Sequence, residues 1–183
     1  MCRLPLTASL LIALLFSLLG GCQLLAPAAP PLAAPLHHEH QLEHLLTLTH
    51  DGQQLRLRCV LETGNGETRV VALNEAGLVL VQMRQNEQGL TVERSALLPD
   101  TFPAEQVMAD IQLIFWPASA IQASLPTAWS LSVEANSRTL YHNGQPVTQV
   151  HYQGSPWQAP SALNNLRYRY QLNLTPLSPD ATP

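Results

Sequence analysis

Five histidines form the densest group of chemically active side chains in the sequence. They fall within fourteen residues and are His37, His38, His40, His44 and His50. In an extended chain His38, His40 and His44 share one face, so their imidazole nitrogens could bind Zn²⁺ or Cu²⁺. Metal sites need rigid placement and supporting groups, whereas this segment lies at the start of the folded domain. We therefore favour a solvated polar edge and predict no metal site, with metal binding as the open alternative.

The sequence carries no motif of a known catalytic site. It has no G-x-S-x-G elbow, no glycine-rich phosphate loop and no C-x-x-C pair. Ser, His and Asp residues occur, but no spacing connects them. We therefore predict that the protein is not an enzyme, has no catalytic residues and needs no cofactor.

Composition and charge exclude two classes of protein. Charged residues make up 12% of the 183 residues, all nine basic residues are Arg, and the net charge is −4. This balance does not suit a nucleic-acid partner, which is bound mainly through its phosphates. An apolar fraction of 46% also excludes a fully disordered chain. The length fits a single folded domain.

The N-terminus has the pattern of an export signal. Residues 4–19 are apolar, follow Arg3, and are short for a membrane span. Leu19-Gly20-Gly21-Cys22 resembles the lipobox of bacterial lipoproteins. That resemblance implies a signal peptide at 1–21 and a membrane anchor on Cys22, made of a covalent diacylglycerol and an N-acyl lipid. Gln23 in place of Asp resembles the sorting signal for the outer membrane. The alternative is an ordinary secretory signal with a chance Cys.

Two flanking segments are predicted to lie outside the domain. Residues 22–36 are rich in Pro and Ala and carry no charge, which favours an extended tether. Residues 177–183 are predicted to be a disordered tail. Cys59 alternates with leucines, so we interpret it as a buried small side chain rather than a reactive thiol.

The domain at 37–176 is predicted to be mainly β. Apolar and polar residues alternate with a period of two, as in antiparallel strands that have one dry and one wet face. Asp51-Gly52, Asn65-Gly66 and Asn143-Gly144 predict tight hairpin turns. The expected strands are 42–50, 53–62, 67–74, 77–84, 89–96, 128–135, 138–142, 145–152 and 165–174. Helical spacing of apolar residues predicts helices at 103–115 and 118–125.

This pattern resembles the LolA/LolB-like superfamily, and more narrowly a family of uncharacterised bacterial lipoproteins within it. Members are often encoded beside clusters for aryl polyene lipid biosynthesis. The residues that carry the resemblance are the lipobox, Asp110-Ile111-Gln112-Leu113 with Trp116-Pro117, and the strand at 168–174. It implies a curved antiparallel sheet of about 9–11 strands, an incomplete barrel, with a short helical insertion covering the concave face.

The resemblance also implies a function. We expect an outer-membrane lipoprotein facing the periplasm that binds or hands on a lipid or amphiphile, such as an aryl polyene or fatty-acyl lipid. The helical insertion would open to admit it. The alternative is a structural or interaction lipoprotein of the cell envelope with a filled core and an envelope protein as partner. The residues predicted to line an apolar cavity are Leu55, Leu57, Leu61, Leu80, Ile111, Phe115, Trp129, Leu131, Tyr168 and Tyr170.

Overall fold

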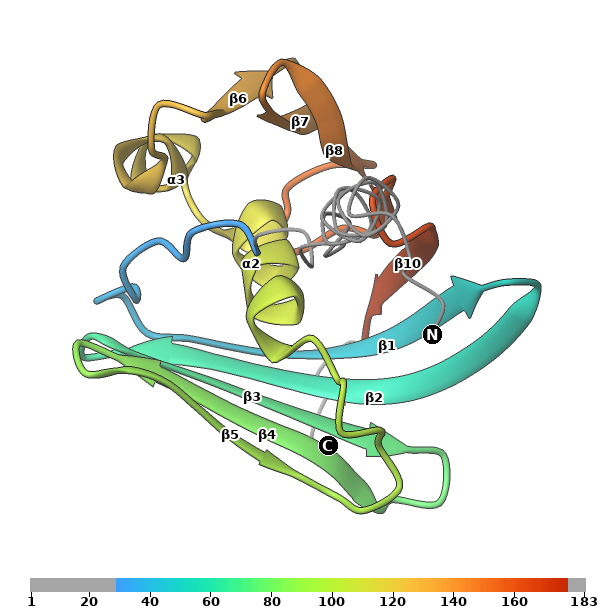
Figure 1. Cartoon of the computed structure of the whole chain (residues 1–183). Helices are drawn as coiled ribbons and strands as arrows, with labels where there is room; N and C mark the ends of the chain where they lie inside the picture. Colours follow the sequence, from blue (N-terminus) through green and yellow to red (C-terminus); the bar gives the residue numbers. More distant parts are fainter. Residues whose placement is uncertain (1–28, 178–183) are drawn as a thin grey trace, which may run out of the picture.

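A computed structural model describes residues 29–177 of the chain (Figure 1). The predicted signal peptide, Cys22 and the tether up to residue 28 lie outside the described residues, as does the tail from residue 178. Within the described part, neither helix is long and apolar enough to cross a membrane.

The fold is mainly β, as predicted, and consists of one ten-stranded antiparallel sheet with two short helices. The first five strands are β1 (His40–His50), β2 (Gln53–Gly64), β3 (Glu67–Asn74), β4 (Val79–Asn86) and β5 (Gly89–Arg94). The helices α2 (Ala104–Phe115) and α3 (Ala118–Ser124) follow. The last five strands are β6 (Trp129–Val133), β7 (Ser137–His142), β8 (Gln145–Tyr152), β9 (Ser161–Asn165) and β10 (Tyr170–Pro176).

The two halves of the sheet join through the first and last strands. The strand order is β5-β4-β3-β2-β1-β10-β9-β8-β7-β6, so β1 pairs with β10 and the sheet ends at β5 and β6. Leu46 lies opposite Leu174 in the antiparallel β1–β10 register. The sheet curves around α2 without closing (Figure 1), which is the half-barrel expected from the sequence.

The three predicted tight turns are confirmed. Both residues of Asp51-Gly52, Asn65-Gly66 and Asn143-Gly144 have positive φ, from 48° to 76°. Two-residue hairpin turns need this backbone conformation, which Asn, Asp and Gly adopt more readily than other residues.

The strand predicted at 165–174 is wrong in one respect, because the structure divides this region into two strands. β9 ends at Asn165, residues 166–169 form a turn, and β10 starts at Tyr170. The Asn165 side-chain oxygen accepts a hydrogen bond from the Tyr168 backbone N–H at 2.9 Å, and Arg169 has a φ of 56°. Asn165 therefore makes the turn, although apolar alternation continues through it in the sequence.

Both segments that we predicted to flank the domain contact it where they are described. The Leu177 backbone N–H donates to the Glu43 carbonyl at 2.8 Å, so residue 177 extends the pairing of β10. Residues 29–36, which we call the strap, lie against the concave face, where Pro30 and Ala33 are buried. This part of the predicted tether is therefore not a free spacer.

The core lies between the concave face and α2. Nine of the twelve residues of α2 are buried, and Met108 and Trp116 are fully inaccessible. A helix that is enclosed on nearly all sides is a core element and not a surface cover. The helical insertion thus occupies the concave face, as predicted, and fills much of it.

Candidate functional site

Most of the side chains predicted to line the interior do face the concave side. Four of them are buried in the core, namely Leu61, Ile111, Phe115 and Trp129, and Leu80 is buried outside the core cluster. Leu57, Leu131 and Tyr170 are partly buried. Leu80 is the extra residue at a register shift, where Ala72 pairs with Val81 and Leu73 pairs with Val79. The sequence therefore located the apolar wall of the half-barrel.

Two of the predicted lining residues are not part of that wall. Leu55 is 42% exposed, because it lies near the start of β2 at the rim of the sheet. Tyr168 belongs to the turn between β9 and β10, so it does not continue the row of Tyr170. The alternation of apolar and polar residues correctly predicted which face of the strand carries Leu55, but not how far it is buried. It also missed the turn that contains Tyr168.

A buried polar cluster connects the middle of α2 to β9 and β10. Asp110 on the helix accepts hydrogen bonds from the Tyr170 hydroxyl, from Gln106 Nε2 at 2.8 Å and from Asn165 Nδ2 at 3.4 Å. Asp110 is 1% exposed. Burial raises the pKa of its carboxyl to about 6, although the three hydrogen bonds partly oppose the shift. Burial and the neighbouring Asp110 also raise the pKa of Tyr170.

A second polar cluster holds the C-terminal end of α2. Arg138 on β7 donates to the carbonyl oxygens of Leu113 at 3.0 Å and Trp116 at 2.6 Å. The Tyr152 hydroxyl on β8 donates to the carbonyls of Leu113 at 3.1 Å and Ile114 at 3.0 Å. The last carbonyls of a helix have no partner within the helix, so these side chains satisfy them. Burial raises the pKa of Tyr152 to about 12, with Arg138 opposing the shift.

The strap is held through its backbone by three side chains. The Ala33 N–H donates to Gln112 Oε1 at 2.8 Å. The Ala33 carbonyl accepts from Gln112 Nε2 at 3.0 Å and from Gln85 Nε2 at 2.9 Å. The Trp116 indole N–H donates to the Ala34 carbonyl at 2.9 Å. The strap therefore passes between α2 and β4, whose glutamines bind the same peptide residue.

The histidine cluster is divided between several environments. His37, His38 and His50 are exposed, and the exposed His40 stacks on Trp157 with ring centroids 4.2 Å apart. His44 is buried beside Phe115, with ring centroids 5.3 Å apart. Burial lowers the pKa of His44, which favours a neutral imidazole. Within residues 29–177, no group of three or more His, Cys, Asp or Glu side chains could hold a metal ion.

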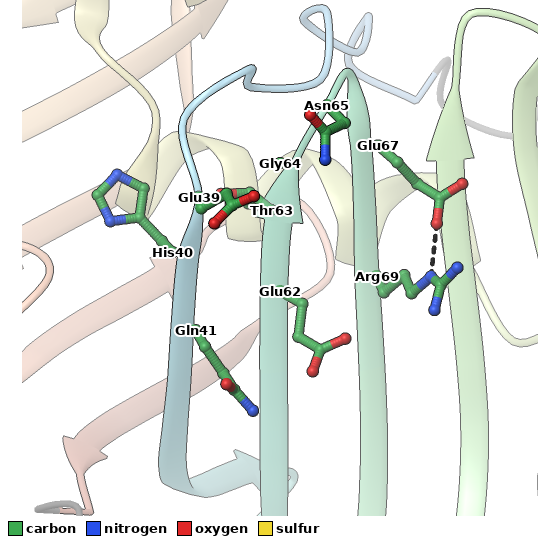
Figure 2. Close-up of a pocket in the computed structure, with 9 residues that line it drawn as sticks. All are labelled: Glu39, His40, Gln41, Glu62, Thr63, Gly64, Asn65, Glu67 and Arg69. Carbon is green, nitrogen blue, oxygen red and sulfur yellow. Dashed lines mark hydrogen bonds and ion pairs between the residues drawn. The ribbon is translucent and has the colours of Figure 1, made fainter.

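A polar pocket of about 530 Å³ opens at one end of β1, β2 and β3. Figure 2 views it from the outer face of the sheet, with α2 behind the strands. Glu39, Glu62 and Glu67 line it together with His40, Gln41, Thr63, Gly64, Asn65 and Arg69. Arg69 Nε pairs with Glu67 Oε1 at 2.5 Å. These solvated carboxylates form a polar surface and not an enclosed acyl site.

Two further pockets of about 370 Å³ each also differ from the predicted apolar cavity. One is lined by Thr49, Asp51, Asn164, Asn165, Leu166, Arg169 and Gln171. The other is lined by Arg69, Val70, Val71, Gln82, Met83, Arg84, Thr91 and Glu93. Neither lining includes a residue of α2 or the strap. The apolar space of the concave face is instead occupied by α2 and the strap.

Sequence reasoning did not identify the residues that position α2 and the strap. Gln85, Gln106 and Asn165 are buried polar residues that alternation and helical spacing treat as ordinary polar positions. Asp110, Gln112 and Trp116 belong to the motif quoted for the family resemblance, but their partners lie far away in the chain. Gln112, for example, binds a residue 79 positions away. The available signal was the polar character of Asp110 and Gln112 among the apolar residues of the second half of the helix.

Comparison with known protein families identifies a match. A family described as "Protein of unknown function (DUF3261)" matches residues 41–178. The matched range begins in β1 and extends past β10, so it includes both helices and nearly the whole sheet. No curated protein matches the chain.

Proposed function

The chain belongs to the DUF3261 family. From its N-terminal sequence and its strap we propose that it is an outer-membrane lipoprotein that binds or hands on a lipid or amphiphile in the periplasm. The observation that carries the proposal is the strap. An extended segment with partly buried Leu32 and Leu36 packs against the core of the concave face. The apolar side chains that pack against Leu32 and Leu36 could pack against an acyl chain in the same way.

The proposed location of the protein, lipid-anchored in the outer membrane, rests on the N-terminal sequence. Leu19-Gly20-Gly21-Cys22 provides the lipobox pattern, and Gln23 favours the outer membrane. Two or more acyl chains anchor a protein stably, at about 0.8 kcal/mol per buried CH₂ group. Replacing Cys22 by Ser should abolish lipid attachment and processing. Mass spectrometry of the mature N-terminus tests this, and a wild-type chain without lipid on Cys22 would contradict it.

We also propose that the domain is a member of the LolA/LolB-like superfamily. Its curved ten-stranded antiparallel sheet with a helix in the concave face supports this assignment. A fatty-acyl or aryl polyene lipid is the ligand class that the resemblance implies. Burial of its tail would contribute about 25 cal/mol for each Å² of apolar surface removed from water.

The first experiment measures lipid binding by the full chain. Lipids that co-purify with the chain are identified by mass spectrometry, and a fluorescent acyl probe is then titrated. Leu90 is a partly buried residue on edge strand β5, where it faces Gln85. Leu90→Asp places a charge at the edge of the groove, and we expect it to weaken probe binding tenfold or more.

The matched control is Thr91→Asp. Thr91 is exposed on the opposite face of the same strand, so the same new charge should change probe binding less than twofold. If the wild-type chain carries no lipid and binds no acyl probe, the proposed function is wrong.

A second candidate function is a non-enzymatic structural or interaction lipoprotein with a filled core. The dense enclosure of α2 favours it, because Met108, Ile114 and Trp116 are at most 1% exposed. In that case an envelope protein would be the partner, and the strap would be a permanent part of the core.

A further inference from the structure

We propose that the groove between α2 and β4 is a binding site for an extended peptide, filled here by the chain's own strap, and that an amphiphile competes with the strap for it. The competition rests on the proposed function, whereas the peptide site does not. The side chains of Gln85, Gln112 and Trp116 define the groove.

The groove recognises the strap through its backbone. Gln112 both accepts from the N–H of Ala33 and donates to the carbonyl of Ala33, as a neighbouring β-strand would. Gln85 adds a second donor to the same carbonyl. Recognition through main-chain groups requires an extended peptide but little particular sequence.

Side-chain size provides the selectivity of the site. Ala33 is 1% exposed, so its methyl group is enclosed and a larger side chain has no space. The adjacent Ala34 is exposed, although its carbonyl binds the Trp116 indole N–H. An aromatic side chain that donates to a carbonyl in a proline-containing segment is typical of grooves that bind extended proline-rich peptides.

The prolines of the strap suit an enclosed segment without a strand partner. Pro30, Pro31 and Pro35 have no backbone N–H, so at these positions there is no donor that burial could leave unsatisfied. A segment of this kind needs few hydrogen bonds to enter the groove and loses few when it leaves.

The two glutamines keep one hydrogen bond to each other when the strap leaves. Gln112 Nε2 donates to Gln85 Oε1 at 2.7 Å, and this bond does not involve the strap. Three donors lose a carbonyl partner and could bind another carbonyl oxygen, namely Gln85 Nε2, Gln112 Nε2 and the Trp116 indole N–H. The acceptor Gln112 Oε1 loses the Ala33 N–H and could accept from an amide N–H. The groove therefore fits an acyl chain that ends in an ester or amide, with its carbonyl oxygen in the position of the Ala33 or Ala34 oxygen.

Release of the strap would also change the reach of a lipid-anchored domain. The eight residues 29–36 span up to about 25 Å when extended at about 3.1 Å per residue. If Cys22 carries the anchor, loading of the groove would therefore lengthen the connection between membrane and domain by up to that distance.

The test of the peptide site compares two variants of the full chain. Ala33→Arg should prevent docking of the strap, whereas Ala34→Arg adds the same charge at the exposed neighbour. The probe is a fluorescent peptide with the sequence of residues 29–36. We expect it to bind Ala33→Arg at least tenfold more tightly than the wild type or Ala34→Arg. A folded Ala33→Arg chain that does not bind the peptide would overturn the proposal.

Hydrogen exchange of the wild-type chain keeps the proposal testable if Ala33→Arg does not fold. We expect the Ala33 amide, which donates to Gln112 Oε1, to exchange through local opening, at least tenfold faster than the buried amides of α2. Exchange of both segments only through global unfolding would make the strap a fixed part of the core and overturn the proposal.

The competition is tested with a fluorescent acyl ester on the same three chains. We expect at least tenfold tighter binding to Ala33→Arg, and displacement of the ester by the strap peptide. Equal binding to all three chains would overturn the competition and leave the proposed function intact. Binding of the peptide but not of the ester to Ala33→Arg would overturn both the competition and the proposed function, while supporting the peptide site.

Discussion

The helix α2 and the strap share the concave face, but they are held there by different means. α2 buries nine of its twelve residues, and side chains from β7 to β10 bind its middle and its C-terminal end. The strap buries Pro30 and Ala33, and it is held through its own backbone by Gln85, Gln112 and Trp116. The helix therefore supplies many residues of the core, whereas the strap adds Ala33 to it and is held by fewer side chains.

This difference changes which part of the molecule can open. The sequence led us to expect that the helical insertion would move to admit a ligand. Moving α2 would leave Asp110 and the carbonyls bound by Arg138 and Tyr152 without partners, and each unsatisfied buried group costs about 1–3 kcal/mol. Removing the strap breaks the hydrogen bonds of Ala33 and Ala34 and uncovers Leu32 and Leu36, which are only partly buried. The strap is therefore the part that is easier to displace.

The largest expected effect comes from placing a charge under α2. Ile111 is 7% exposed, so Ile111→Asp should lower the free energy of unfolding by about 4 kcal/mol or more. Ala33→Arg should cost less than about 2 kcal/mol, because the strap can leave the groove and solvate the new charge. Urea denaturation of the full chain measures both values.

Glu105→Ala, at an exposed position of the same helix, is the control and should stay within about 0.5 kcal/mol of the wild type. If Ile111→Asp and Ala33→Arg lowered the free energy of unfolding by the same amount, the distinction between helix and strap would be wrong.

The next effect is a pH dependence at Asp110. Its pKa is raised from 3.8 to about 6 in the folded chain, so the folded state binds this proton more tightly than the unfolded state. The stabilisation is complete below about pH 4 and is lost as the pH rises through 6. The total change is about 3 kcal/mol. Tyr170 stays neutral throughout, because burial and Asp110 raise its pKa.

Asp110→Asn is the matched variant for this measurement, because its side chain cannot titrate. The difference in unfolding free energy between wild type and Asp110→Asn should decrease by about 2 kcal/mol from pH 4 to pH 7. A difference that stays constant over this range would contradict the raised pKa. Strap docking should not show this dependence, because none of its hydrogen bonds involves Asp110.

The sheet was predictable because its signals are local. Tight turns at Asp51-Gly52 and Asn65-Gly66 need positive φ, and few residue pairs provide it. Alternation predicts which face of each strand is dry. The same rule failed at Leu166 and Tyr168, where alternation continues through a turn that Asn165 makes with its own side chain. Local pattern thus fixes most strands but cannot detect a turn that preserves the pattern.

The contacts that hold α2 and the strap in the concave face were not predictable, because they join residues far apart in the sequence. A composition rich in Pro and Ala indicates that residues 29–36 form neither helix nor strand, but not the surface that they contact. Asp110 and Tyr170 are 60 positions apart, and Ala33 and Gln112 are 79 positions apart. A single sequence offers no signal that joins such pairs, so the buried glutamines and the strap became evident only in the structure.

A smaller effect is expected at the C-terminal end of α2. Tyr152→Phe removes the hydroxyl that donates to the carbonyls of Leu113 and Ile114. The loss should lower the free energy of unfolding by about 1 kcal/mol, as measured by urea denaturation. Tyr141→Phe on the neighbouring strand β7 removes an equivalent hydroxyl from a partly buried side chain and should change stability by less than about 0.5 kcal/mol. An equal loss for both variants would indicate that the Tyr152 contact with α2 contributes nothing specific.

The last prediction concerns the rate at which the Cys59 thiol is labelled. This rate should depend on whether α2 stays in place much more than on whether the strap does. Cys59 is 8% exposed and lies opposite His44, the residue that contacts Phe115 of α2. Burial raises the pKa of its thiol to about 12, so the native state has almost no reactive thiolate at pH 8. Labelling with iodoacetamide, located at Cys59 by peptide mass spectrometry, should therefore follow opening of the core. We expect Ala33→Arg to raise the labelling rate much less than Ile111→Asp does, because release of the strap leaves α2 in place. Ile111→Asp should raise the rate at least tenfold. If Ala33→Arg accelerates labelling as strongly as Ile111→Asp does, then α2 leaves together with the strap and the two are one cooperative cover of the concave face.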